Sequence, residues 1–261
     1  MNVLFFGDIV GRPGRQALKK ILPEWKNKYQ PDLIIANGEN SSHGKGITKK
    51  CLDEILSIGV DLITLGDHSF DQKETISLLE NKKNHIIRPA NYPSDTPGSG
   101  YYILEIGSKK VIIINLIGQT YMSEQYDNPF TKANEILEQI KDEANIIIVD
   151  FHAEATSEKV CMGWHLDGRV SAVLGTHTHI PTADARILTN GTAYISDVGM
   201  VGSKDSSLGM DKDIAIKRFL TQIKTKFEIA QGPVIVNAVL LENNKNGKTK
   251  EIKQLQKTIA L

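Results

Sequence analysis

Five short apolar runs in this 261-residue chain each end in residues that can ligate a metal. An apolar run of this length, bounded by turn signals, is typical of a buried strand. In open α/β sheets the carboxyl ends of such strands share one edge, where ligands bind. The polar side chains are therefore expected to meet at one rim. The segments are Gly7-Asp8, Gly38-Glu39-Asn40, Gly66-Asp67-His68, Asp150-Phe151-His152 and Gly175-Thr176-His177-Thr178-His179.

Strand-like and helix-like segments alternate through the first half, which favours a parallel or mixed α/β sheet over an all-β fold. Apolar spacing predicts helices over residues 13–29, 48–58, 71–80 and 131–141. Hairpins are predicted at residues 107–109 and 190–191, and between 233–242 and 248–256. No linker or repeat divides the chain. We expect one domain, residues 1–261, with two sheets packed together and flanked by helices.

Acidic and basic residues balance at 31 each, so the chain lacks the basic field that drives general nucleic-acid binding. A nucleotide-sized substrate stays compatible with this balance, because a metal site supplies its own positive charge. Cys51 and Cys161 form no CxxC and are expected to be reduced core residues. The first apolar run lacks a basic leader, and no run approaches the roughly 20 residues that span a bilayer. We expect a soluble, cytoplasmic protein without a membrane segment.

The His177-Thr178-His179 motif is the most specific chemical signal. Residues two apart on an extended chain point the same way, so the two imidazoles are expected to chelate a transition metal together. Oxygen and nitrogen donors combined suit Mn, Fe or Zn better than Ca. The other candidate ligands are Asp8, Glu39, Asp67 and His152.

Several of these residues also have ordinary structural explanations. Asp8 is suited to cap the helix that begins near Pro13. Glu39 can belong to a polar turn, and a lone histidine such as His152 is often a hydrogen-bonded structural residue. His68 titrates near neutrality, so it is a candidate proton donor to a leaving group. Asp71, one turn later, either orients that imidazole or caps a helix.

Seven stretches together resemble the calcineurin-like metallophosphoesterases and, within them, the YmdB-type branch of bacterial phosphodiesterases. They occur in the family's order from residue 7 to residue 200. They are GDIVGRPGR (7–15), ANGENSSHGKGIT (36–48), TLGDHSFD (64–71), RPANYP (88–93), VDFHAEATSEK (149–159), DGRVSAVLGTHTHIPTADARI (167–187) and GTAYISDVGM (191–200).

The resemblance implies a four-layer α/β/β/α sandwich of two mixed sheets with a dinuclear metal centre at the strand ends. Val10 stands where the wider family has a histidine, and Asn40 is implied to take its place. Glu39 would bridge the two ions, and His68 would be the general acid. One ion would be held by Asp8, Glu39, Asn40 and His179. The other would be held by Glu39, Asp67, His152 and His177.

The resemblance also implies the reaction. A hydroxide bridging two ions, Fe or Mn with Mg or Zn as alternatives, would attack a phosphodiester, and a 2',3'-cyclic nucleotide is the implied substrate. A phosphomonoesterase remains open. So do a metal-dependent amidohydrolase, since those enzymes also use HxH, and a regulatory or RNA-associated protein whose metal centre is structural. Self-association into a homo-oligomer is left open by base rates.

This chain departs from the family at one position, where Asp67-His68 replaces the usual Asn-His. With Asp8 and Glu39, a third carboxylate would bring the ligand shell close to neutrality. We hypothesise that Asp67 tightens metal binding, favours one ferric ion and weakens attraction for anionic phosphate.

Overall fold

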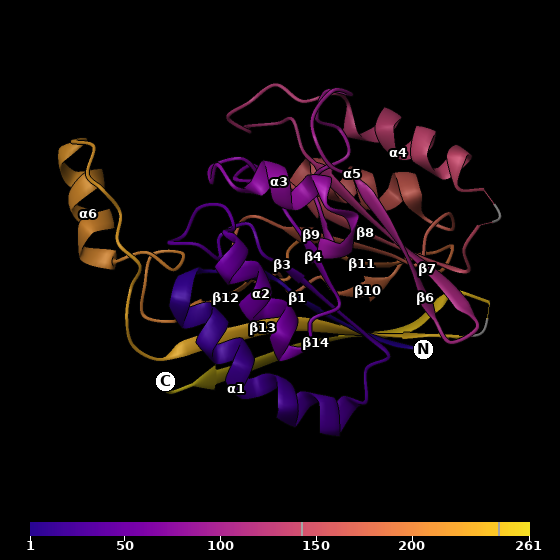
Figure 1. The fold of residues 1–261 in the computed structure, drawn as a ribbon, viewed down its shortest axis with the longest axis horizontal. Helices are drawn as coiled ribbons and strands as arrows, with labels where there is room; N and C mark the ends of the chain where they lie inside the picture. Colours follow the sequence, from indigo (N-terminus) through magenta and orange to yellow (C-terminus); the bar gives the residue numbers. More distant parts are fainter. Residues whose placement is uncertain (142, 245) are drawn as a thin grey trace.

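The computed structural model describes residues 1–141, 143–244 and 246–261. Two mixed β-sheets face each other, and helices cover their outer sides (Figure 1). The four-layer α/β/β/α architecture implied by the resemblance is therefore confirmed.

The first sheet brings three of the predicted strand ends to one edge. Its parallel part pairs β1 with β3, β3 with β4 and β4 with β5. The predicted antiparallel pair near the end of the chain is confirmed as the long hairpin β13–β14. It extends the sheet through an antiparallel pairing of β13 with β1, which the sequence did not predict. The strand order is β2 (Asp8–Ile9), β12 (Met200–Ser203), β13 (Val234–Asn243), β1 (Asn2–Phe6), β3 (Leu33–Asn37), β4 (Leu62–Thr64) and β5 (Ile86–Ile87), with β14 (Thr249–Ile259) beside β13.

The second sheet has a parallel centre and two antiparallel edges. β7, β8, β9 and β11 are parallel neighbours. The predicted hairpins at residues 107–109 and 190–191 form the edges, where β6 pairs with β7 and β10 pairs with β11. The order is β10 (Arg186–Ile187), β11 (Ala193–Ile195), β9 (Ala172–Thr176), β8 (Ile146–His152), β7 (Lys109–Ile117) and β6 (Tyr101–Ile106).

Most helices fall where the apolar spacing predicted them. Thr48 caps α2 by accepting a hydrogen bond from the Cys51 amide, and Asn128 caps α4 in the same way. The sequence predicted a helix over residues 71–80, but α3 begins at Thr75. The residues before it, 67–74, form turns after β4 instead. The helices are α1 (Gly11–Tyr29), α2 (Lys49–Ile58), α3 (Thr75–Glu80), α4 (Pro129–Gln139), α5 (Thr156–Leu166) and α6 (Lys212–Thr221), with a short 3₁₀ turn, η1, at Lys82–Asn84.

Three apolar layers hold the sandwich together. Alternate residues of β1 point to opposite sides, so Phe5 lies between the two sheets while Phe6 faces α1. Phe6 stacks on Trp25 of α1 with ring centroids 5.6 Å apart. A third layer packs α4 and α5 against the second sheet, around residues such as Phe151 and Met162. Because each sheet is packed on both faces, the edges formed by the carboxyl ends of the strands are held in fixed positions relative to each other.

The two cysteines differ in burial. Cys51 is buried and free, but Cys161 is exposed, so the prediction that both are core residues is wrong for Cys161. In the portion of the chain that the structure describes, no helix combines the length and apolar character needed to cross a bilayer.

Candidate metal centre

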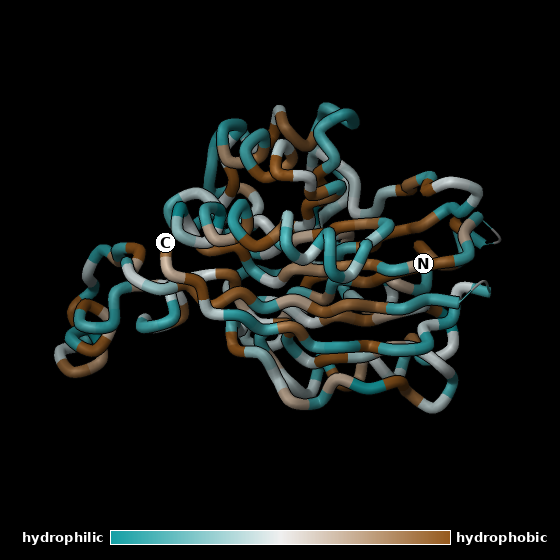
Figure 2. Tube along the Cα trace, turned by 90° about the horizontal axis from the view of Figure 1, so that it is seen from below, coloured by the Kyte–Doolittle hydropathy of each residue, from teal (hydrophilic) through white to brown (hydrophobic). Residues whose placement is uncertain are grey.

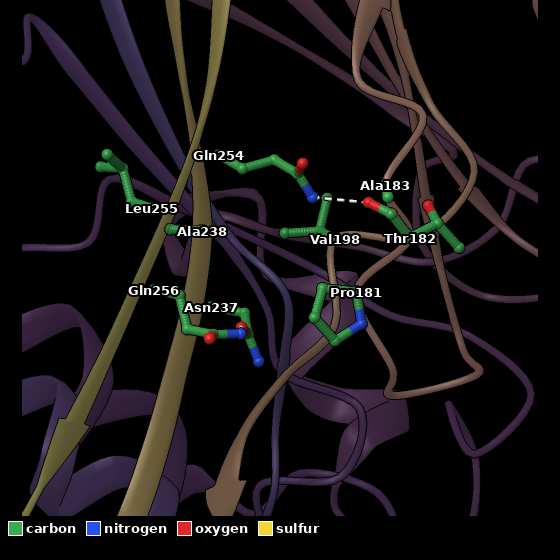
Figure 3. A pocket seen from close by; sticks show the side chains of 9 residues that line it. All are labelled: Pro181, Thr182, Ala183, Val198, Asn237, Ala238, Gln254, Leu255 and Gln256. Carbon is green, nitrogen blue, oxygen red and sulfur yellow. Dashed lines mark hydrogen bonds between the residues drawn. The ribbon is translucent and has the colours of Figure 1, made fainter.

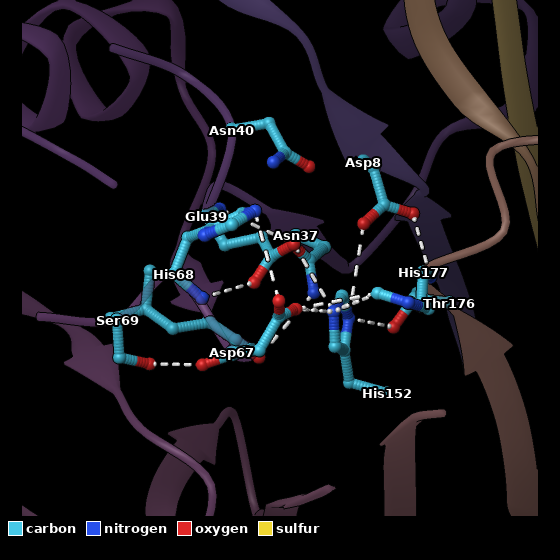
Figure 4. Close-up of polar contacts among 12 residues, drawn as sticks. Asp8, Asn37, Glu39, Asn40, Asp67, His68, Ser69, His152, Thr176 and His177 are labelled. Atoms are coloured by element: carbon cyan, nitrogen blue, oxygen red, sulfur yellow. Dashed lines mark hydrogen bonds and ion pairs between the residues drawn. The ribbon is translucent and has the colours of Figure 1, made fainter. Parts of the chain in front are cut away.

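The two sheets deliver the predicted polar residues to a common rim (Figure 4). Asp8 lies just past β1, while Glu39 and Asp67 follow β3 and β4 of the same sheet. His152 ends β8 of the second sheet, and His177 follows β9. Side chains from distant parts of the chain therefore converge at the junction of the two sheets.

Four of these side chains form a compact cluster. Ligand atoms of Glu39, Asp67, His152 and His177 all lie within 4.8 Å of one another. His152 Nε2 is 3.1 Å from Glu39 Oε1, 3.0 Å from Asp67 Oδ1 and 2.9 Å from His177 Nδ1. One ring N–H cannot satisfy three such neighbours. The donor set is the one expected around a cation.

A second group lies beside the first. His179 Nε2 is 3.1 Å from Asn40 Oδ1 and 3.9 Å from Asp8 Oδ1. Asp8 is fully buried, and within the described residues nothing donates a hydrogen bond to its Oδ1. A buried carboxylate oxygen without a partner is costly unless a cation neutralises it. The residues therefore fit a second metal position, and Asp8 Oδ1 is 3.8 Å from His152 Nδ1 of the first group.

Close packing around the cluster depends on Gly66. A Cβ at this position would lie 2.2 Å from Glu39 Oε2 and 2.4 Å from His152 Nε2. Any other residue would push two candidate ligands out of place. The Gly that precedes Asp67-His68 therefore keeps the rim compact enough for a shared ion.

The loop that carries the two HxH histidines differs from the extended geometry expected. β9 ends at Thr176, and both His177 (φ 99°) and His179 (φ 65°) adopt positive φ. The two imidazoles consequently join different groups instead of chelating as one pair. Such conformations are unfavourable for non-glycine residues and need support from their surroundings.

A buried ion pair supplies that support. Asp197 Oδ2 accepts hydrogen bonds from Lys159 Nζ at 2.7 Å, Thr178 Oγ1 at 2.7 Å and the Thr178 amide at 3.0 Å. Asp197 Oδ1 accepts a further bond from the Gly199 amide at 2.8 Å. Asp197 thereby fixes the residue between the two histidines.

Asp150 supports His152 from behind, a role that the sequence reasoning did not assign. Thr176 Oγ1 lies 2.9 Å from His152 Nδ1 and donates to Asp150 Oδ1 at 2.7 Å. Burial raises the pKa of Asp150 to about 6, against the lowering effect of His152 and the hydroxyl of Thr64. The sequence does contain a signal for this role, because Asp150 is a carboxylate inside an apolar strand, two residues before His152.

His68 stands at the edge of the cluster. Its Nδ1 lies 3.0 Å from Asp71 Oδ2, and its Nε2 lies 3.7 Å from Asp67 Oδ2. Asp71 thus orients the imidazole, and the alternative role as a helix cap is wrong because Glu74 occupies the N-cap of α3. His68 is partly exposed, so its ring can reach a bound substrate.

Glu154 adds an outer contact to the cluster, with Oε2 3.1 Å from His177 Nε2. A carboxylate on the far nitrogen of a metal-binding histidine fixes the ring and its tautomer. This arrangement leaves Nδ1 of His177 facing His152 and Asp67.

The electrostatics of the cluster favour positive charge. Burial lowers the pKa of His152, but Glu39 and Asp67 outweigh burial and raise it well above the ordinary value. Burial raises the pKa of Asp67, but hydrogen bonds to His152 and His177 reverse the effect and hold it far below its usual range.

A separate hollow of about 290 Å³ lies between the β13–β14 hairpin and the segment that begins at Pro181 (Figure 3). Gln254 donates a hydrogen bond across it to the Thr182 carbonyl at 2.6 Å. None of the described residues that line it is ionisable, so this hollow is not a second candidate catalytic site.

The fold and the clustered ligands are those that the resemblance to the calcineurin-like metallophosphoesterases implied. The structure of a putative 5'-nucleotidase from Staphylococcus aureus shares this fold, with a TM-score of 0.63 and 15% identity over 98% of this chain and 54% of that one. Residues 4–255 match the family model described as YmdB-like protein. The chain belongs to this family, and the resemblance seen in the sequence is confirmed.

Two relatives match nearly the whole chain. The 2',3'-cyclic-nucleotide 2'-phosphodiesterase of Bacillus subtilis (strain 168) is 46% identical over 242 residues, which cover 93% of this chain and 91% of that protein. The crystal structure of a hypothetical protein from Thermus thermophilus is 41% identical, with a TM-score of 0.93 and 99% of both chains covered.

Proposed function

We propose that this protein is a dinuclear metal-dependent phosphodiesterase that hydrolyses a 2',3'-cyclic nucleotide. The observation that carries the proposal is the convergence of Glu39, Asp67, His152 and His177 within 4.8 Å. The named activity of the Bacillus subtilis relative supports phosphoric ester hydrolysis, and its level of identity supports the narrower substrate class.

In this proposal the candidate ligands form two sets, one for each of two metal ions. Glu39 Oε1 lies 3.1 Å from His152 Nε2 of the first group, and Glu39 would also bind the second ion and so bridge the two. Bound ions would neutralise charge on the phosphoryl oxygens and lower the pKa of a shared water. One position would be held by Asp8, Glu39, Asn40 and His179, and the other by Glu39, Asp67, His152 and His177. Fe and Mn are the proposed metals, with Mg and Zn as alternatives that the same donors accept.

His68 would protonate the leaving oxygen. Its Nδ1 is held by Asp71 at 3.0 Å, which leaves Nε2 on the side of Asp67 and the candidate metal centre. In a cyclic 2',3'-diester the leaving group is a ribose hydroxyl, and an alkoxide leaves poorly without a proton. These contacts support the proposed role of His68 at the step where such a proton is needed.

The decisive experiment compares the purified protein on bis(p-nitrophenyl) phosphate, 2',3'-cyclic nucleotides, 3',5'-cyclic nucleotides and monoesters. We expect turnover of the 2',3'-cyclic substrates with Mn²⁺ and loss of turnover after chelation. Glu39→Gln should abolish turnover and lower the bound metal, while the exposed Glu242→Gln should alter neither. Activity that survives chelation, or confinement of activity to monoesters, would contradict the proposal.

We place the enzyme in the cytoplasm, acting on a small free substrate without general affinity for nucleic acid, in keeping with its balance of 31 acidic and 31 basic residues.

A further inference from the structure

The RPANYP segment (88–93) takes no part in the proposed metal chemistry, although it lies at the same rim. It follows β5, an apolar strand like those that appear as hydrophobic stretches in the middle of the body in Figure 2. β5 is the parallel neighbour of β4, whose end leads to Gly66 and Asp67. The segment therefore approaches the candidate metal centre from one edge of the first sheet.

Two buried polar side chains hold this segment in place. Arg88 is 6% exposed, and its guanidinium donates to the carbonyls of Pro89 at 2.8 Å and Thr96 at 2.9 Å. Asn91 is fully buried, donates to the Ile117 carbonyl at 2.8 Å and accepts from the Ile117 amide at 2.9 Å. Because Ile117 belongs to β7 of the second sheet, Asn91 ties the segment to both halves of the sandwich. The residue that follows Asn91 is therefore fixed in position.

Tyr92 is that residue, and it is the middle member of three packed aromatic rings. Its ring centroid is 5.3 Å from that of Phe70 and 4.9 Å from that of Tyr126, with interplanar angles of 78° and 66°. Edge-to-face contacts of this kind are a geometry that aromatic pairs prefer. Phe70 belongs to the loop after β4 and Tyr126 to the loop after β7, so the Tyr92 ring is held between loops of the two sheets.

The hydroxyl of Tyr92 has only a weak acceptor among the described residues. It donates to the Gly66 carbonyl at 3.5 Å, whereas O–H···O hydrogen bonds usually span about 2.5–3.0 Å. That carbonyl already accepts from the Ser69 hydroxyl at 2.6 Å and from the Ser69 amide at 3.2 Å. A carbonyl oxygen has two lone pairs, and Ser69 uses both. The Tyr92 hydroxyl is therefore available to a better acceptor.

This hydroxyl lies on the side of the candidate ligands. Burial raises the pKa of Tyr92 to about 12, and the carboxylates of Asp67 and Glu39 act in the same direction. The phenol therefore stays protonated near neutral pH and remains a donor beside two carboxylates that can only accept. Part of the Tyr92 side chain is exposed, so a substrate can contact it.

Tyr126 supplies a second donor behind Tyr92. Its side chain is 6% exposed, and within the described part of the chain its hydroxyl has no hydrogen-bond partner. A buried hydroxyl without a partner is unfavourable. Burial raises the pKa of Tyr126, and the neighbouring Tyr92 hydroxyl raises it further. Tyr126 can therefore donate to the Tyr92 oxygen once Tyr92 donates to a ligand.

We propose that Tyr92 binds the substrate: its hydroxyl donates a hydrogen bond to a phosphoryl oxygen, and Tyr126 positions it by donating to the Tyr92 oxygen. The inference rests on the proposed function, in which a phosphodiester binds at the candidate metal centre. A charged phosphoryl oxygen is a stronger acceptor than the Gly66 carbonyl, and hydrogen bonds in such a chain strengthen one another. The RPANYP segment then holds a neutral donor against an anionic substrate.

Tyr92→Phe and Tyr126→Phe test the two hydroxyls, because each change keeps the ring and its packing. With Mn²⁺ and 2',3'-cyclic AMP, Tyr92→Phe should lower kcat/KM by about 10–100-fold, since it removes a hydrogen bond to a charged group. Tyr126→Phe should lower kcat/KM by about 2–10-fold, and it should cost nothing further in the Tyr92→Phe background. Tyr102→Phe is the matched control, because its hydroxyl bonds the carbonyl of Lys82 at 3.3 Å, before β5 and not at the rim that follows it. The control should leave kcat/KM unchanged.

Calorimetric titration of inorganic phosphate into the Mn²⁺-loaded protein gives a readout that does not depend on turnover. Tyr92→Phe should raise the phosphate Kd by at least about 10-fold, while bound Mn²⁺ and Tm stay as in the wild-type protein. Unchanged phosphate affinity would overturn the proposal even if kcat/KM fell, because the hydrogen bond would then belong to the nucleoside. Loss of bound Mn²⁺ in Tyr92→Phe would overturn it too, because the hydroxyl would then support the metal centre instead. A wild-type protein that binds phosphate through Tyr92 but cleaves no diester would contradict the proposed function and support this hydrogen bond.

Discussion

Replacing Lys159 tests how the loop of His177 and His179 is held. Lys159 and Asp197 pair at 2.7 Å, with side chains 3% and 1% exposed. Removing one partner of a buried ion pair typically costs about 3–5 kcal/mol, because the other charge is left uncompensated. Asp197 keeps donors from Thr178 and Gly199, so we place Lys159→Met at the lower end, about 3 kcal/mol.

That loss should appear as a fall in Tm of about 6–12 °C for a chain of this size. Urea unfolding, with and without Mn²⁺, measures the free energy directly. Metal affinity should also fall by about 10–100-fold, because the loop loses an outer support. Lys257→Met is the control, since its pair with Glu24 is exposed and is expected to contribute less than about 1 kcal/mol. A loss below about 1 kcal/mol for Lys159→Met would refute the reasoning.

Three further results are expected. His68→Ala should lower kcat by about 10²–10⁴-fold with unchanged metal content, and near-normal turnover would remove His68 from the mechanism. Asp67→Asn should weaken metal binding and raise diesterase turnover at saturating Mn²⁺; unchanged affinity together with no gain would defeat the hypothesis about this carboxylate. Adding Mn²⁺ at about 100 times its Kd to chelated protein should stabilise it by about 2.7 kcal/mol, as measured by calorimetry. No shift in Tm would mean that the folded rim does not hold the ion.

The sequence predicted the layers because local signals agreed with the tertiary arrangement. The apolar runs before Asp8 and Glu39 became central strands, and the Asn190-Gly191 turn formed the hairpin expected. Buried parallel strands leave little choice about where their polar ends lie, so the rim followed from strand order.

Other features depended on contacts that no local pattern records. The positive φ of His177 and His179 is held by Asp197, which lies far along the chain from its partner Lys159. The function of Asp150 required knowledge that Thr176 stands between it and His152. The sequence did not predict α6. This helix packs against little of the rest of the protein, so its apolar residues lack the one-sided pattern of α1 and α2.

The proposed ligands come from both halves of the sandwich: Glu39 and Asp67 from one, His152 and His177 from the other. Ions bound here would cross-link the halves at one end, whereas most of the interface between them is apolar side chains. Removing the ions would then weaken the contact between the two sheets along its whole length. Amide hydrogen exchange should therefore become faster in β3 and β8, including at residues far from the ligands.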